Sequence, residues 1–272
     1  MTTLLLTGAT GLVGSRLLPR LVDAGFECRA LVRRDIALPG GVSAVRGDLD
    51  DPATLASAVE GIDAVVHLAA LFRTGDEDAI WRANLDGTRH LVEAVAAHAP
   101  AARFIMASTG NVYDATAERP SRESDSCSPT AAYPASKLAA EDLLRECGLT
   151  WSILRLPFVY GDGDGHLASM PALAARFGLH PAHAYSVAHH RDVAAIVRLA
   201  LSGAADRRIV NLTDDAPVTV WEMAELAGGS IEGSAAPLEN PWAGRMDGSL
   251  ARELGFRPGV PTIRMAAAEG IL

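Results

Sequence analysis

Tyr133 and Lys137 are the two residues of this 272-residue chain whose types and spacing best fit acid-base chemistry. Pro134 lies between them, and because proline is tolerated in the first turn of a helix but not in its interior, it predicts that a helix begins near Tyr133. Residues four apart share one helix face, so the phenol and the ammonium are expected side by side. The cation and the helix N-terminus both favour phenolate, which predicts a Tyr133 pKa below its usual value of about 10. The alternative is a packed tyrosine and a solvated lysine.

Three glycines near the start of the chain follow an apolar run and precede a helical pattern. Gly8 would allow a sharp turn at the end of a strand, Gly11 would let the backbone approach a diphosphate, and Gly14 would let the helix pack against the strand. The free N–H groups of the helix N-terminus suit an anion. The segment therefore predicts a dinucleotide site, and its presence favours the catalytic interpretation of Tyr133 and Lys137.

Short β-rich runs alternate with longer helical patterns through the first two thirds of the chain. Strands are predicted over residues 4–7, 28–32, 43–46, 64–67, 103–107 and 151–154, and helices over 14–24, 52–59, 78–98 and 131–147. This alternation predicts an α/β fold, a doubly wound parallel sheet of the Rossmann type with a small C-terminal substrate-binding cap.

The domain organisation follows from where the alternation breaks down. We predict a dinucleotide-binding domain over residues 1–161, a cap segment over 162–184, a return to the first domain over 185–212, and a substrate-binding C-terminal portion over 213–272. In the returning segment a helix is expected over 192–201, with the Asp192 carboxylate as its cap.

The composition excludes several classes of function. The net charge is −9, from 24 basic and 33 acidic side chains, and no basic stripe is present, which argues against nucleic-acid binding. The sequence shows no leader pattern and no apolar stretch near the roughly 20 residues that span a bilayer, so we expect a cytoplasmic protein without a membrane partner. Three cysteines without CxxC spacing predict free thiols and no metal site.

Taken together, these patterns resemble the extended branch of the short-chain dehydrogenase/reductase superfamily, specifically the NAD-dependent epimerase/dehydratase family. The resemblance covers essentially the whole chain. Its motifs occur in the expected order: TGxxGxxG at residues 7–14, Gly47-Asp48-Leu49, His67-Leu68-Ala69-Ala70, Asn84, Ser108-Thr109 ahead of Val112-Tyr113, the Tyr133 and Lys137 pair, and the run 156–161.

The resemblance implies a role for each matching position. Thr109 would orient the substrate oxygen beside the catalytic Tyr133, and Lys137 would also hold the nicotinamide ribose, whereas His67 is expected only to pack. Further cofactor contacts are implied for Gly8, Thr10, Gly11, Leu12, Val13 and Gly14 in the loop, Asp48 and Leu49 at the adenine, Leu68, Ala69 and Ala70 along the middle, and Asn84, Ser108, Pro157 and Val159. The helices over 78–98 and 131–147 form a dimer in many relatives, so a homodimer is expected by analogy alone.

The end of the second predicted strand bears on the choice of cofactor. NAD-preferring enzymes usually place an acidic residue near position 33, but this chain has Arg33 and Arg34. Two guanidinium groups would attract a 2′-phosphate, so we predict NADP(H) over NAD(H). The alternatives are that both arginines are solvated, that one stacks on adenine, or that Asp35 reaches the ribose.

Departures from the family pattern bear on the substrate. Gly110-Asn111 stands where dehydratases of the family carry an acidic pair, and Phe158 stands where nucleotide-sugar members commonly carry asparagine. The resemblance therefore favours a smaller or less charged carbonyl compound. The expected substrate contacts are Leu71, Thr109, Phe158 and Tyr160, of which the apolar ones could equally be core.

We accordingly predict an NADP(H)-preferring oxidoreductase that transfers a hydride between nicotinamide and a carbonyl or alcohol substrate, with Tyr133 as general acid or base. One alternative is a nucleotide-sugar epimerase with tightly bound NAD. Another, from a different class, is a non-catalytic NADP-binding sensor, which the presence of both Tyr133 and Lys137 disfavours.

Overall fold

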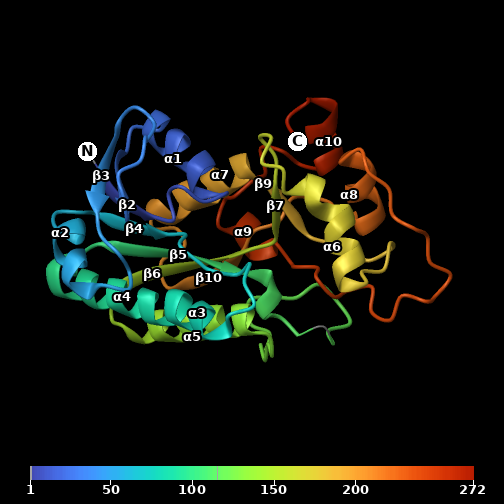
Figure 1. The fold of residues 1–272 in the computed structure, drawn as a ribbon, viewed down its shortest axis with the longest axis horizontal. Helices are drawn as coiled ribbons and strands as arrows, with labels where there is room; N and C mark the ends of the chain where they lie inside the picture. Colours follow the sequence, from blue (N-terminus) through green and yellow to red (C-terminus); the bar gives the residue numbers. More distant parts are fainter. Residues whose placement is uncertain (1, 115) are drawn as a thin grey trace.

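The structure is a computed structural model that describes residues 2–114 and 116–272. Its centre is a seven-stranded parallel sheet in the order β10-β6-β5-β4-β1-β2-β3 (Figure 1). The strands are β1 (Thr3–Thr7), β2 (Glu27–Val32), β3 (Val42–Arg46), β4 (Ala64–His67), β5 (Arg103–Thr109), β6 (Thr150–Leu156) and β10 (Arg208–Asn211). The three leucines of β1 are fully buried, as expected of a parallel strand covered on both faces. The predicted doubly wound α/β fold is confirmed.

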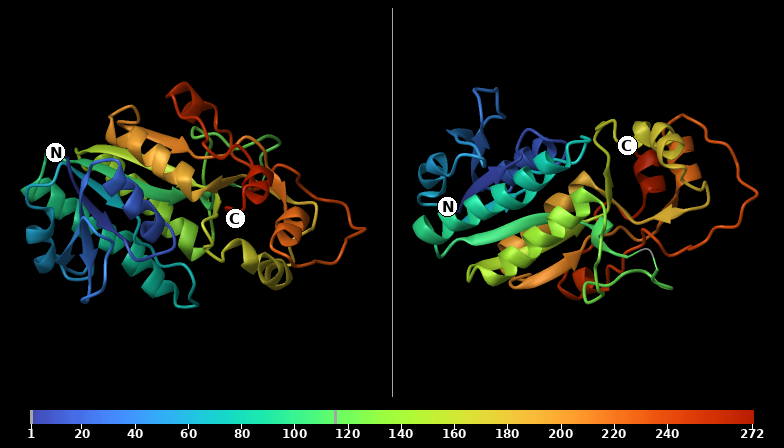
Figure 2. Two further views of the ribbon diagram at one scale, coloured as in Figure 1. Left: turned by 90° about the horizontal axis from the view of Figure 1, so that it is seen from above. Right: turned by 60° about the horizontal axis from the view of Figure 1, so that its bottom comes forward.

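Helices cover both faces of the sheet (Figures 1 and 2). One face packs against α1 (Gly14–Asp23) and α7 (His190–Leu201), and the other against α2 (Leu55–Val59), α4 (Gly87–His98) and α5 (Ala132–Glu146). Because the chain passes from β1 outward to β2 and β3 and then returns to β4, the strand order reverses between β1 and β4. In such sheets ligands bind at this reversal, beyond the carboxyl ends of the strands. No helix in the described residues is both long and apolar enough to cross a membrane.

The helix expected over 78–98 is divided into three parts. A short α3 (Glu77–Trp81) leads into a π-helical turn, η2 (Arg82–Asp86), before α4 begins. The wider π turn holds the side chain of Asn84 in the interior, where its amide bonds the backbone of Leu71. Single π turns of this kind occur often beside functional sites. The helix expected over 52–59 likewise begins as a 3₁₀ turn, η1 (Pro52–Thr54).

The predicted cap at Asp192 is wrong. The N-cap of α7 is His189, whose ring Nδ1 accepts from the backbone N–H of Arg191. The Asp192 carboxylate instead accepts from the backbone N–H groups of Gly259 and Val260, at 2.5 and 3.3 Å. It therefore ties the C-terminal part of the chain to the first turn of α7.

A second, smaller unit lies beside the carboxyl ends of the strands (Figure 1). Its elements are β7 (Phe158–Tyr160) paired with β9 (Val187–His189), β8 (Ala184–Tyr185) paired with β11 (Val218–Thr219), η4 (Leu167–Ser169), α6 (Met170–Phe177), α8 (Val220–Leu226) and α10 (Ile263–Ala268). These elements share an apolar core of their own. The C-terminal portion differs from the prediction in one respect: α9 (Ser249–Glu253) and Phe256 pack into the core of the main domain with α1 and α7.

Candidate active site

The glycine loop has the close contacts that its spacing suggests. Gly8 has a positive φ of 69°, and a Cβ there would lie 2.6 Å from the backbone nitrogen of Ala69. A Cβ on Gly14 would lie only 2.1 Å from the carbonyl oxygen of Gly8, so α1 can begin this close to β1 only with glycine. Gly11, by contrast, is exposed, and a Cβ on it would approach no protein atom nearer than 3.3 Å. Its open face fits a ligand that needs the backbone itself.

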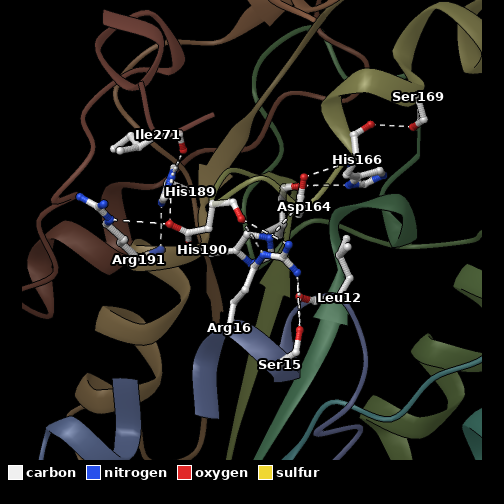
Figure 3. Close-up of polar contacts among 12 residues, drawn as sticks. Leu12, Ser15, Arg16, Asp164, His166, Ser169, His189, His190, Arg191 and Ile271 are labelled. Atoms are coloured by element: carbon white, nitrogen blue, oxygen red, sulfur yellow. Dashed lines mark hydrogen bonds and ion pairs between the residues drawn. The ribbon is translucent and has the colours of Figure 1, made fainter. Parts of the chain in front are cut away.

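Figure 3 shows how the loop is joined to the cap. Arg16, on the first turn of α1, donates to the carbonyl of Leu12 at 3.2 Å and to the carbonyl of Asp162 at 3.4 Å. Next to this contact, the Asp164 carboxylate bonds His190 Nε2 at 2.8 Å and accepts from the backbone N–H of His166. The turn-rich run 161–165 signalled a joint in the sequence, but nothing there revealed these partners.

Thr109 is the last residue of β5, and Tyr133 and Lys137 lie one helical turn apart at the start of α5. Lys137 is 2% exposed and Thr109 is buried, whereas Tyr133 is partly exposed. Burial raises the pKa of Tyr133, and a side-chain hydrogen bond with Thr109 acts in the opposite direction. The expected lowering of the Tyr133 pKa is therefore wrong for the protein alone. Burial also lowers the pKa of Lys137 to about 8, opposed by the charge of Glu141.

Asn84, an expected cofactor contact, is held by hydrogen bonds to the protein itself. Its side chain is fully buried, its Oδ1 accepts from the N–H of Leu71, and its Nδ2 donates to the Leu71 carbonyl and to Ser136 Oγ. Ser136 in turn donates to the carbonyl of Tyr133. Every polar atom of the amide therefore has a protein partner, and Asn84 supports the backbone at Leu71 and the first turn of α5.

His67 serves the packing role expected of it. The ring is fully buried between the hydroxyls of Thr7, at 2.7 Å, and Thr88, at 2.9 Å. Burial, with a smaller effect of the nearby Lys137 charge, lowers the His67 pKa to about 3. The imidazole is therefore neutral throughout the physiological range.

The remaining predicted cofactor residues line the carboxyl edge of the sheet. Arg33 and Arg34 are exposed beyond the end of β2. Asp48 lies in a turn closed by Thr54, whose Oγ1 accepts from the Asp48 N–H at 2.9 Å. The other positions that are exposed or partly exposed are Thr10, Leu12, Val13, Leu49, Leu68, Ala69, Ala70 and Pro157, while Ser108 and Val159 are buried.

Two phenylalanine side chains make ring contacts at or after the carboxyl ends of strands, and one of them contacts Tyr133. The Phe72 ring lies against Tyr133 with centroids 5.3 Å apart, and the guanidinium of Arg73 lies 4.9 Å from the Phe72 ring. From the cap, Phe158 stacks on His166 at 4.1 Å. Leu71 and Phe158 are partly exposed, so both can meet a substrate. Tyr160 cannot: it is 0% exposed and packs in the cap core, which overturns its prediction as a substrate contact.

A buried ion pair beneath these residues was not found from the sequence. Arg155 donates to both carboxylate oxygens of Glu141, at 3.1 and 2.6 Å, and Ser108 donates a short hydrogen bond to the same carboxylate. The guanidinium also lies over the Tyr113 ring, whose hydroxyl donates to Asn211 at 2.7 Å. The only signal was the spacing of Glu141, four residues after Lys137 on one helix face.

The residues present fit a nicotinamide dinucleotide. The Gly8 and Gly14 contacts bring β1 and α1 together around an exposed Gly11, and the buried Lys137 ammonium makes no hydrogen bond to any described residue. No group of three or more histidine, cysteine or acidic side chains within residues 2–114 and 116–272 is placed to hold a metal ion. The fold and the site are thus those of a dinucleotide-dependent enzyme of the short-chain dehydrogenase/reductase type.

Comparison with known proteins agrees with this class. Residues 4–212 match the model of the NAD dependent epimerase/dehydratase family, and the chain belongs to that family. It is 31% identical over 285 residues to a 4-hydroxy-2-methyl-3-oxo-4-farnesyl-3,4-dihydroquinoline-1-oxide ketoreductase of Stigmatella aurantiaca, covering 96% of this chain and 84% of that protein. It is 36% identical over 175 residues to a ceramide reductase of Caulobacter vibrioides, covering 63% of this chain and 50% of that protein.

Among solved structures, MoeE5 in complex with UDP-glucose and NAD is similar over nearly the whole fold. The TM-score is 0.81 with 26% identity, covering 98% of this chain and 96% of that one. The relatives thus include a ketoreductase and a ceramide reductase, as well as a protein solved with UDP-glucose and NAD.

Proposed function

We propose that this protein is an NADP(H)-preferring oxidoreductase that interconverts a carbonyl compound and its alcohol, with Tyr133 as the general acid or base. The observation that carries the proposal is a partly exposed Tyr133 that hydrogen-bonds the buried Thr109 and precedes the buried Lys137 by one helical turn, at the carboxyl end of the sheet. Lysine is used only here: of the 24 basic residues, 23 are arginine. The pKa of a buried lysine shifts more readily than that of arginine, so the choice of lysine over arginine at position 137 affects the chemistry there.

In the reducing direction, the Tyr133 phenol donates its proton to the substrate oxygen as the carbonyl carbon becomes tetrahedral, and the product is an alcohol. The Thr109 hydroxyl bonds the same oxygen and orients it. A bound nicotinamide dinucleotide supplies the hydride. Lys137 would hold its ribose, and the N–H groups around Gly11 would hold its diphosphate. The Lys137 charge favours the phenolate that remains.

Two further features support the preference for NADP(H) and the proposed class of substrate. Arg33 and Arg34 are exposed beyond β2, where they are free to meet a 2′-phosphate. Phe72 presents apolar surface beside Tyr133, and Phe158 is a partly exposed apolar side chain where nucleotide-sugar members of the family commonly carry asparagine, so an uncharged carbonyl compound suits the site better than a sugar diphosphate. The ketoreductase and the ceramide reductase reported above also support a carbonyl compound as the substrate.

The test is Tyr133→Phe with NADPH and a panel of ketones and aldehydes, followed by absorbance at 340 nm. We expect wild-type turnover and a loss of at least about 100-fold in kcat for the variant, with dinucleotide binding retained. Full activity of Tyr133→Phe would refute the role of the phenol. Nicotinamide that copurifies with the protein, and a sugar isomerised without net absorbance change, would favour the epimerase instead.

A further inference from the structure

Glu141 is a buried carboxylate on α5, one helical turn after Lys137. We propose that Glu141 is a positioning residue: its buried carboxylate is the counter-charge that keeps the Lys137 ammonium protonated beside Tyr133, and Arg155 sets how much of that charge Lys137 receives. This inference deepens the proposed function and rests on it.

The geometry ties all three side chains to the interior. Glu141 follows Lys137 by one helical turn on α5, and its side chain is 1% exposed, against 3% for Arg155. Arg155 comes from β6 and holds the carboxylate through two hydrogen bonds. Ser108 adds a third contact from β5, directly before Thr109. The carboxylate is thus fixed in place by partners on two strands and cannot turn toward solvent.

The buried cluster contains two cations and one anion. Burial lowers the pKa of Lys137 and the Glu141 charge raises it. For Arg155, burial acts to lower the pKa, but the hydrogen bonds and charge of Glu141 together with the contact of Tyr113 outweigh it, so the guanidinium stays charged. Three other titratable groups packed here are neutral near pH 7: His67 from β4, Tyr133 on α5, and Tyr113, whose pKa burial raises to about 12. The partly exposed Glu123 acts on Arg155 and Tyr113 rather than on Lys137, and burial raises the pKa of Cys127, which lies near Arg155 and Glu141. Glu141 is therefore the nearby anion that acts on Lys137.

Two substitutions should move the protonation of Lys137 in opposite directions. Glu141→Gln leaves two buried cations without an anion, so Lys137 should lose its proton at lower pH, by about one pH unit or more. Arg155→Met leaves the carboxylate to Lys137 alone, so the titration midpoint of Lys137, the pH at which it is half protonated, should move to higher pH. The double variant restores one net positive charge and should return the midpoint toward that of the wild type. A role in packing alone does not predict opposite signs.

The chain offers an unusually clean measurement, because Lys137 is its only lysine. Protein grown with ¹³C-lysine should give one side-chain CεH₂ signal, whose chemical shift against pH reports the Lys137 midpoint without cofactor or turnover. Asp142→Asn is the matched control: it removes a negative charge from the neighbouring, exposed position of the same helix and should leave the midpoint unchanged. Glu141→Asp, which keeps the charge, should titrate closer to the wild type than Glu141→Gln.

A second readout connects the cluster to the reaction. With NADPH and a ketone found for the wild type, the alkaline limb of kcat/KM should move down in pH for Glu141→Gln and up for Arg155→Met. Shifts of the Lys137 signal in one common direction, or no shift in either variant, would overturn the inference. If Glu141→Gln does not fold, the same substitution in the Arg155→Met background should be tolerated better, since replacing both partners of a buried pair is less destabilising than removing one. The Lys137 midpoint of this double variant should then lie below that of Arg155→Met, and equal midpoints would overturn the inference. Opposite shifts combined with an active Tyr133→Phe would instead mark the proposed function as the part that failed.

Discussion

The Phe72 ring rests against the Tyr133 ring, with centroids 5.3 Å apart and planes inclined by 42°. The two residues are 61 positions apart in the sequence, one after β4 and the other in the first turn of α5. Phe72 is 47% exposed, so its ring also offers an apolar surface on the outer side of the proposed acid. This contact makes Phe72 both a support for the tyrosine and a candidate substrate contact.

Phe72→Ala should therefore lower kcat/KM with little effect on stability. Loss of an aromatic contact worth roughly 1 kcal/mol corresponds to about a fivefold fall in kcat/KM. Phe177→Ala removes a comparable ring that is 62% exposed on α6 of the cap and serves as the control. Steady-state kinetics and thermal unfolding of both variants give the comparison, and an equal fall for both would remove any special role of Phe72.

Two substitutions in the glycine loop should have different effects on stability and on dinucleotide binding. A Cβ on Gly14 meets the backbone of Gly8 and Ala9, so Gly14→Ala should lose about 1 to 3 kcal/mol of stability as well as dinucleotide binding. Gly11→Ala meets only the Gly8 carbonyl, at 3.3 Å, and should fold normally while binding NADPH weakly. Urea unfolding and fluorescence titration with NADPH separate the two effects. Gly40→Ala, with no atom within 4 Å of the added carbon, is the neutral control.

Arg33→Ala should weaken binding of NADPH by about 10- to 100-fold, because hydrogen bonds between charged partners contribute roughly 1.5 to 3 kcal/mol. Binding of NADH should change little, since NADH lacks the 2′-phosphate. Titrations of the wild type and of Arg33→Ala with both dinucleotides test this. Equal affinity of the wild type for the two cofactors would show that the arginines do not select for phosphate.

Asp214 gives a pH dependence of stability with a definite sign. Burial is the main cause that raises its pKa to about 8, and its Oδ2 has no hydrogen-bond partner among the described residues. Because the folded protein holds this proton more tightly than the unfolded chain, the contribution of Asp214 is full at low pH, declines as the pH rises above the unfolded value of about 4, and is lost at about pH 8.

Asp214→Asn removes this dependence. The free energy of unfolding of the variant, relative to that of the wild type, should therefore rise between pH 5 and pH 8.5, and urea unfolding at the two pH values measures it. Taking the difference between variant and wild type cancels the titration of the other groups. A difference that stays constant with pH would mean that Asp214 is ionised in the folded protein across this range.

The sequence by itself determined the parts of this protein that depend on neighbouring residues. Alternating apolar and helical runs specify strands and crossover helices, the glycine spacing specifies a tight strand-to-helix turn, and Pro134 specifies where α5 begins. Each of these is a matter of local backbone geometry. The Tyr133 and Lys137 pair could be recognised for the same reason, because a separation of four residues places two side chains on one helix face.

Only the tertiary structure decided what surrounds those residues. Asn84 finds its partners 13 and 52 positions away, and Tyr160 lies in a core assembled from the cap and the C-terminal segment. The direction of the Tyr133 pKa shift was mispredicted because burial, which no local pattern reveals, outweighs its side-chain hydrogen bond. Desolvation and the pairing of buried charges depend on contacts between distant segments, so they arise only when the chain has folded.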